Sequence, residues 1–239
     1  MKKRSLMILI FSLITAFSLS MPVFSAEGGE NGFQVGSGTD EDSGSGGGFI
    51  ELKLKTSEWA QAEVKEAYSL GLIPLEMSST NFNTGVTREQ FAAIAVKLYE
   101  KIMEKKADYS IVDFPFSDCD TEKSFTAYIA AAYKLGITNG TGAGIFSPHD
   151  TITREQLATM LHRVILKANA EGRAARDMSV SEIVFSDEAS ISEYATQSVY
   201  YMAQRGIIKG MSENTFVPQG VASKEQAVII SLRIAKALY

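Results

Sequence analysis

Three short polar segments of the sequence combine a hydroxyl, a cation, a carboxylate and an amide in the same order. They are Thr87-Arg88-Glu89-Gln90, Thr153-Arg154-Glu155-Gln156 and Ser223-Lys224-Glu225-Gln226. A Thr or Ser followed three positions later by Gln predicts a capping box. In this motif the hydroxyl accepts the amide N–H of the third helical residue, and the Gln side chain accepts the N–H of the cap. Each segment is therefore expected to begin a helix.

The cation that follows the capping residue is not explained by capping. A positive charge beside the positive end of a helix dipole is unfavourable by about 0.3–1 kcal/mol, although a neighbouring glutamate can offset this cost. A guanidinium beside free helix amides is also suited to bind an anion. Because the cation recurs in all three segments, we expect Arg88, Arg154 and Lys224 to recognise an anionic ligand.

The three segments belong to a longer internal repeat. Each is preceded by a phenylalanine and, further upstream, by a glycine in an apolar context. These residues are Gly71 and Phe82, Gly136 and Phe146, and Gly206 and Phe216. The second and third copies also open alike, with Phe116-Ser117-Asp118 and Phe185-Ser186-Asp187, whereas the first copy has no clear counterpart of the aspartate.

Each copy predicts two helices with a loop between them. The first helices are expected over residues 58–70, 121–135 and 192–205, each ended by its glycine in the left-handed conformation. The second helices start at the capping boxes and carry one apolar face each. These faces are Phe91/Ile94/Leu98/Ile102, Leu157/Met160/Val164/Ala168 and Ala227/Ile230/Ile234/Leu238. Since no long alternating pattern predicts a sheet, we expect an all-α fold of three helical hairpins packed around a shared core.

The composition argues against several classes of function. Twenty-three Lys and Arg against 28 Asp and Glu give a net charge of −5, which disfavours nonspecific nucleic-acid binding. One cysteine, Cys119, cannot form an intramolecular disulfide, and two histidines leave little material for a zinc site or a His-based triad. The glycine-rich run over residues 140–144 lacks the third glycine of a nucleotide-binding loop and follows a predicted helix. We expect no catalytic residues, no metal and no cofactor.

The N-terminus has the three-part layout of a secretory signal peptide. Lys2, Lys3 and Arg4 precede an apolar run over residues 6–17, and small residues follow near position 25. The run is shorter than the ~20 residues of a membrane span, which favours cleavage over an uncleaved anchor. Residues 1–26 are predicted to be the signal and residues 27–50, rich in Gly and Ser, a flexible acidic linker. The mature chain is expected to be secreted, without a membrane segment.

Together these motifs resemble S-layer homology domains. The resemblance is carried by the Phe-Ser-Asp opening, the glycine after the first helix, the Phe-x-Pro loop and the Thr-Arg-Glu start of the second helix. It implies three tandem copies, at residues 51–112 (repeat one), 113–180 (repeat two) and 181–239 (repeat three). The implied fold is a pseudo-threefold, three-pronged bundle of helix-loop-helix repeats.

The resemblance also implies a function. In that family the grooves between repeats bind pyruvylated secondary cell-wall polysaccharide linked to peptidoglycan, which anchors exported proteins noncovalently to the cell wall or surface layer. By position, ligand binding is carried over to Arg88, Arg154, Lys224, Gly71, Gly136, Gly206, Asp118, Asp187 and Trp59. Lys224 replaces the family's arginine, and repeat one lacks the opening aspartate. Other surface-layer proteins are further expected partners.

Two other functions stay open at this point. A wall-glycan-processing enzyme would need two carboxyl groups roughly 5–10 Å apart in a cleft. A purely structural or protein-interaction helical module would have no affinity for the polymer. A turnover assay together with a polymer-binding assay distinguishes the three functions.

Overall fold

The computed structural model describes residues 32–33, 54–212 and 214–239. The predicted signal peptide and nearly all of the predicted linker lie outside these residues. The described part is helical, which confirms the all-α prediction. Its helices are η1 Glu58–Ala60, α1 Gln61–Ser69, η2 Leu75–Met77, α2 Arg88–Met103, α3 Ser124–Lys134, α4 Arg154–Ala170, η3 Glu188–Ser190, α5 Glu193–Gln204 and α6 Lys224–Leu238. Two short strands, β1 Gly32–Phe33 and β2 Leu54–Lys55, pair antiparallel.

The second helix of each repeat begins where its capping box predicts. Helices α2, α4 and α6 start one residue after Thr87, Thr153 and Ser223. In all three the hydroxyl accepts the N–H of the third helical residue, and the glutamine side chain accepts the N–H of the cap. Two donors that a helix start leaves unsatisfied are thereby paired.

The first helices end at the predicted glycines. Gly71, Gly136 and Gly206 have φ angles of 72°, 72° and 66°, in the left-handed region that glycine adopts without steric cost. The Gly71 N–H donates to Tyr68 O at 2.9 Å and the Leu72 N–H to Ala67 O at 3.0 Å, which is a Schellman motif. The same pair of hydrogen bonds forms at the other two glycines.

The helices pair between repeats rather than within them. Helix α3 packs against α2, α5 against α4, and α1 against α6, so the first helix of each repeat lies beside the second helix of the preceding one. The prediction of three helical hairpins is wrong in this respect. Antiparallel hairpins need loops of about 2–5 residues, whereas the loop from Leu70 to Thr87 is long enough to send the second helix to another partner.

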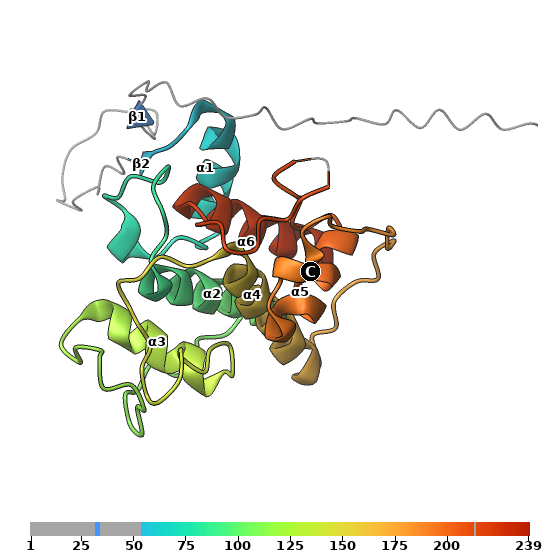
Figure 1. Ribbon diagram of the computed structural model, residues 1–239. Coiled ribbons are helices and arrows are strands. Elements are labelled where there is room, and N and C mark those ends of the chain that lie inside the picture. Colours follow the sequence, from blue (N-terminus) through green and yellow to red (C-terminus); the bar gives the residue numbers. More distant parts are fainter. Residues whose placement is uncertain (1–31, 34–53, 213) are drawn as a thin grey trace, which may run out of the picture. The chain divides into compact units, whose positions relative to one another are not determined.

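The second helices form the centre of this bundle. Helix α2 packs against both α4 and α6, and α1, α3 and α5 lie outside them (Figure 1). The apolar faces predicted for the second helices are buried. Phe91, Ile94, Leu98, Leu157, Val164 and Ile234 are each at most 1% exposed. The prediction of a core shared by the three repeats is confirmed.

Backbone hydrogen bonds close the three repeats into a ring. The segment just before each capping box meets its two counterparts: Val86 N donates to Ala222 O at 2.9 Å, Ala222 N to Ile152 O at 3.2 Å, and Ile152 N to Val86 O at 3.0 Å. Each segment therefore both donates to and accepts from another repeat. Repeat three is bonded back to repeat one, so the pseudo-threefold arrangement is closed.

We expect removal of repeat three to destabilise the rest of the chain. A chain that ends at Ala174 loses α6, which packs against α1 and α2, and leaves Val86 N and Ile152 O without their partner Ala222. Exposed apolar faces and broken ring bonds should give a lower and broader thermal unfolding transition. A truncated chain that melts as high and as sharply as the intact one would contradict the shared core.

Candidate functional site

The two motif arginines are buried against the loop of the next repeat. Arg88 Nε donates to Phe146 O at 2.8 Å, and Arg154 Nε donates to Phe216 O at 2.8 Å. Each guanidinium also lies over the phenylalanine ring, with its central carbon 5.0 and 4.9 Å from the ring centre. The arginines are only 5% and 6% exposed. They therefore join neighbouring repeats.

Lys224 makes the corresponding contact from repeat three to repeat one. Its Nζ donates to Thr84 Oγ1 at 2.6 Å and to Gly85 O at 3.0 Å, and the side chain is as buried as the two arginines. Burial lowers the pKa of Lys224 and lowers the pKa of Arg154 to about 10. A pKa of about 10 leaves the Arg154 guanidinium protonated at neutral pH. The Lys224 ammonium therefore makes the same kind of contact between repeats as the two guanidinium groups.

The helix amides that would bind an anion beside these cations are already occupied. In α2 the N–H groups of Arg88 and Glu89 donate to Asp150 O and Pro148 O. The corresponding amides of α4 and α6 donate to carbonyls of the next repeat in the same way. The expectation of an anion at a free helix N-terminus therefore loses its physical basis, and what remains available is the outer part of each cationic head.

Asp118 and Asp187 each clamp the loop of their own repeat. The two carboxylate oxygens of Asp118 accept the N–H groups of Phe146 and Ser147 at 2.9 and 2.7 Å, and those of Asp187 accept Phe216 and Val217 at 2.8 and 2.7 Å. Burial raises the pKa of both carboxyl groups, but these amide hydrogen bonds lower it by more. In repeat one, Phe82 N donates to the carbonyl of Lys55 instead, so strand β2 takes the place of the aspartate.

The motif glutamates tie the repeats together. Glu155 accepts the N–H and the hydroxyl of Ser192 at 3.0 and 2.8 Å and the hydroxyl of Tyr194 at 2.9 Å. Glu225 accepts the N–H and hydroxyl of Ser57 at 3.1 and 3.0 Å. The sequence analysis gave these glutamates only an electrostatic role beside the cation, because their partners lie in another repeat.

Two aromatic side chains at equivalent positions of the first helices reach the surface. Trp59 is 42% exposed and Tyr194 is 55% exposed, and repeat two has Ser124 at this position. Burial of its hydroxyl and the hydrogen bond to Glu155 raise the pKa of Tyr194 to about 12. These rings are surfaces on which the apolar face of a sugar could stack.

The three glycine turns lie far from the motif cations. Gly71 lines a hollow of about 650 Å³ together with the C-terminal half of α2, and Gly206 lines one of about 310 Å³ with α6. Neither hollow is lined by a motif cation. Lys97, which lines the first, is nine residues beyond Arg88, or about 14 Å along the helix. The predicted site residues therefore do not form one site: the motif cations lie where repeats are joined, and the glycine turns of repeats one and three lie at the hollows.

A second cation recurs in each repeat and was missed by the sequence analysis. Lys97, Arg163 and Arg233 each stand nine residues after the motif cation and lie beside the glycine turn of their own repeat. Lys97 and Arg233 line the two hollows, and Arg163 Nη1 donates to Ile137 O, next to Gly136, at 3.4 Å. Because the three cations occupy the same position of each copy, aligning the three repeats with one another would have revealed them.

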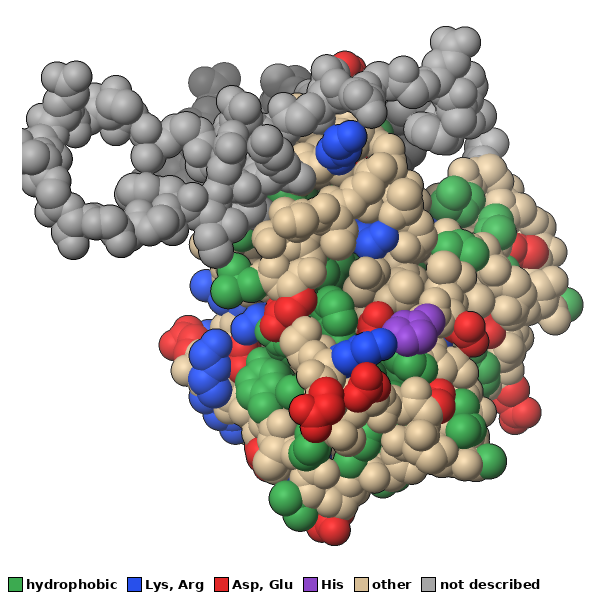
Figure 2. Space-filling model, turned by 90° about the vertical axis from the view of Figure 1, so that its left-hand side faces the viewer, with side chains coloured by type: hydrophobic (Ala, Val, Ile, Leu, Met, Phe, Trp, Pro, Cys, Tyr) green, Lys and Arg blue, Asp and Glu red, His purple; other side chains and the backbone are tan. Residues whose placement is uncertain are grey.

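Charges of both signs lie on the face of the protein that Figure 2 draws. Figure 2 shows one face on which acidic and basic side chains alternate without a broad patch of one sign. Among the described residues, no group of three or more His, Cys, Asp or Glu is placed to hold a metal ion. Of the helices described, none has the length and apolar character needed to cross a membrane.

Comparison with known proteins gives a match to the S-layer homology domain family at residues 115–158 and 184–228, within repeats two and three. An amylopullulanase from Thermoanaerobacterium thermosulfurigenes is 30% identical over 119 residues, which make up 48% of this chain and 6% of the relative. A cell surface protein from Thermoanaerobacter kivui is 26% identical over 119 residues, 50% of this chain and 15% of the relative. An exoglucanase, XynX, from Acetivibrio thermocellus is 29% identical over 120 residues, 48% of this chain and 11% of the relative. The chain thus spans only a small part of each relative's length.

We expect Arg154→Ala to lower stability because it removes a joint between repeats two and three. The guanidinium donates to two carbonyls, Phe216 O and Lys209 O, and the loss of bonds from a buried charged donor should cost about 2–3 kcal/mol. Arg173, an exposed arginine paired with Glu104, provides the control, since Arg173→Ala should cost at most about 1 kcal/mol. Chemical denaturation measures both, and equal effects would argue against the joint.

Asp187 should make stability depend on acid pH. Because its folded pKa lies below the usual value, its contribution is complete at neutral pH and is lost as the pH falls below about 4. Asp187→Asn turns an acceptor into a donor facing an amide N–H, so it should cost about 1–3 kcal/mol at pH 7 and flatten the acid dependence. Asp177→Asn, at an exposed position, is the control. An unchanged pH profile in the Asp187 variant would refute this assignment.

Proposed function

Since residues 115–158 and 184–228 of this chain belong to the S-layer homology domain family, we propose that it is a noncovalent cell-wall anchor. Its ligand is a pyruvylated secondary cell-wall polysaccharide linked to peptidoglycan. In this proposal repeat one is a third copy of the domain, since it shares the capping box, the glycine turn and the ring bonds with the other two. The proposal is supported by the closed ring of three repeats and by the cation that lies beside the glycine turn of each repeat.

The predicted site residues take two different roles in this proposal. The motif cations join one repeat to the loop of the next, and the opening aspartates hold the loop of their own repeat in place. The glycine turns and the exposed aromatic ring of Trp59 are the parts that a polysaccharide can touch. A carboxylate on the sugar pairs with a groove cation, which is a charge-assisted contact.

The proposal assigns binding to this chain and no turnover. Two of these relatives are named as enzymes, but the similarity covers only 6% and 11% of their lengths. The cell surface protein matches over a similar stretch. A segment shared by enzymes of different specificity and by a surface protein supports a role in attachment. An export signal at residues 1–26 and a surface location belong to the same proposal, as does assembly with other surface-layer proteins.

Co-sedimentation with purified cell-wall sacculi tests the proposed function. We expect the chain to sediment with native sacculi, to be released by chaotropes without peptidoglycan hydrolysis, and to lose binding when pyruvate is stripped from the polymer. Incubation with the purified polymer should release no reducing ends. Equal binding to native and stripped sacculi would overturn the proposed ligand, and polymer cleavage would overturn the non-enzymatic role.

A further inference from the structure

The grooves beside the three glycine turns differ in how open they are. The hollow between repeats one and two, at Gly71, measures about 650 Å³, about twice the 310 Å³ of the hollow at Gly206. A Cβ built on Gly71 would meet no other atom within 4 Å, and the same holds at Gly136 and Gly206. The larger hollow falls within the range of small-ligand sites, about 300–1,000 Å³.

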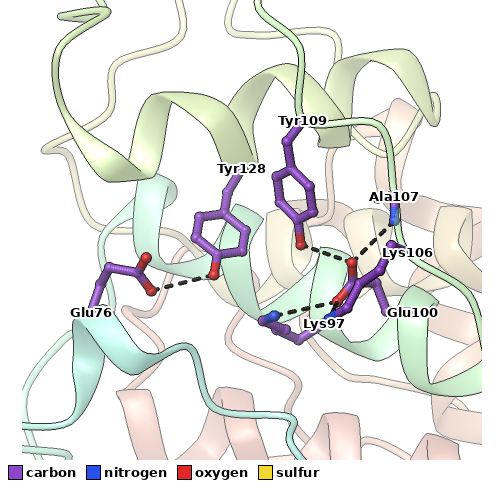
Figure 3. A network of polar contacts seen from close by, with 7 residues as sticks. All are labelled: Glu76, Lys97, Glu100, Lys106, Ala107, Tyr109 and Tyr128. Atoms are coloured by element: carbon purple, nitrogen blue, oxygen red, sulfur yellow. Dashed lines mark hydrogen bonds and ion pairs between the residues drawn. The ribbon is translucent and has the colours of Figure 1, made fainter.

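A buried carboxylate arranges the lysines of the larger groove. Glu100 accepts Lys97 Nζ at 3.3 Å and Lys106 Nζ at 3.1 Å, and also the Ala107 N–H and the Tyr109 hydroxyl, both at 3.0 Å (Figure 3). Burial raises the pKa of Glu100, but these four donors lower it by more. An ammonium group has three N–H donors, and Lys97 and Lys106 each give one to Glu100, so each keeps N–H groups that can bind a ligand.

The aromatic wall of the same groove links two repeats. Tyr128 of α3 donates its hydroxyl to Glu76 of η2 at 3.3 Å, and Lys97 Nζ lies 5.6 Å from the centre of the Tyr128 ring (Figure 3). Leu75 stands next to Glu76 and is exposed, and Lys101 lines the hollow without an ion pair among the described contacts. The groove therefore combines cations, carboxylates and apolar surface.

The cations beside the two other glycine turns are bonded within the protein, as Lys97 is to Glu100. Arg233 Nε lies 3.5 Å from Glu63, and Lys236 bonds Glu66 at 2.8 and 3.0 Å, so α6 and α1 are bridged beside Gly206. In the groove at Gly136, Arg163 donates to Ile137 O, a carbonyl of the turn itself. The position of Glu100 is taken there by Leu166, which cannot accept a hydrogen bond.

We propose that the groove between repeats one and two is the principal sugar-binding groove of this chain, with Lys97 and Lys101 facing a carboxylate carried by the sugar. This assignment rests on the proposed function, which it narrows to one of three grooves. Lysine N–H groups bind the carboxylate, Glu76 and the Glu100 network accept hydroxyl protons, and Leu75 contacts the apolar face of the ring. The other two grooves bind more weakly because the position of Lys101 is taken there by Lys167, which pairs with Glu171, and by Ala237.

Matched substitutions at the three glycine turns test this assignment. Asn tolerates the left-handed conformation, and a Cβ on Gly71, Gly136 or Gly206 meets nothing within 4 Å. Gly71→Asn, Gly136→Asn and Gly206→Asn should therefore perturb the fold equally, while each fills a different groove. The probe is a pyruvylated fragment of the wall polymer, and thermal melting of each variant reports its folding.

We expect Gly71→Asn to weaken binding at least tenfold and the other two variants to change it less than threefold. Lys97→Met with Lys101→Met should reproduce the loss, with Arg233→Met as the matched control. If Gly136→Asn or Gly206→Asn reduces binding as much as Gly71→Asn, the assignment of the groove is wrong although the proposed function stands. A native chain that binds no wall polymer would overturn the proposed function and this assignment with it.

Discussion

The fold depends on three backbone segments whose N–H and C=O groups form hydrogen bonds with one another. Val86, Ile152 and Ala222 each donate one hydrogen bond to another repeat and accept one from the remaining repeat. Buried backbone groups must be paired, and no two repeats can complete the cycle without the third. Gly85 lets the segments approach, since a Cβ there would stand 3.0 Å from Val221 Cγ1 and 3.1 Å from Thr151 Cγ2. The repeats are therefore parts of one cooperative unit.

The ring also determines what the motif cation does. Once the segment before each capping box is bonded to another repeat, the first turn of the second helix lies against that repeat's loop. The helix amides are then satisfied by loop carbonyls, and the arginine reaches the carbonyl of the loop phenylalanine. An anion would have to displace these contacts. The motif cations are therefore engaged in bonds between repeats.

Features set by neighbouring residues were predictable from the sequence. The capping boxes and the left-handed glycines each need only a few consecutive residues, and all six are found as predicted. The pairing of α1 with α6 depends on residues far apart in the chain, so the helical period alone did not reveal it. For the same reason the sequence did not predict that Arg88 and Arg154, expected to recognise an anion, are buried against the loop of another repeat. Burial of a charge is decided by the loop of another repeat, which no local pattern encodes.

The repeated backbone separates folding from recognition. Ring, caps and turns are shared by the three repeats, whereas the residue twelve positions after the motif cation is Glu100, Leu166 or Lys236. The ring bonds join backbone groups and involve none of these side chains, so replacing them leaves the ring intact and alters the charge beside a glycine turn. Glu100 accepts hydrogen bonds from two lysines and Lys236 pairs with Glu66. The side chain of Leu166 can form neither contact. Three copies of one fold can thus diverge into grooves of different affinity without loss of the joint that holds them together.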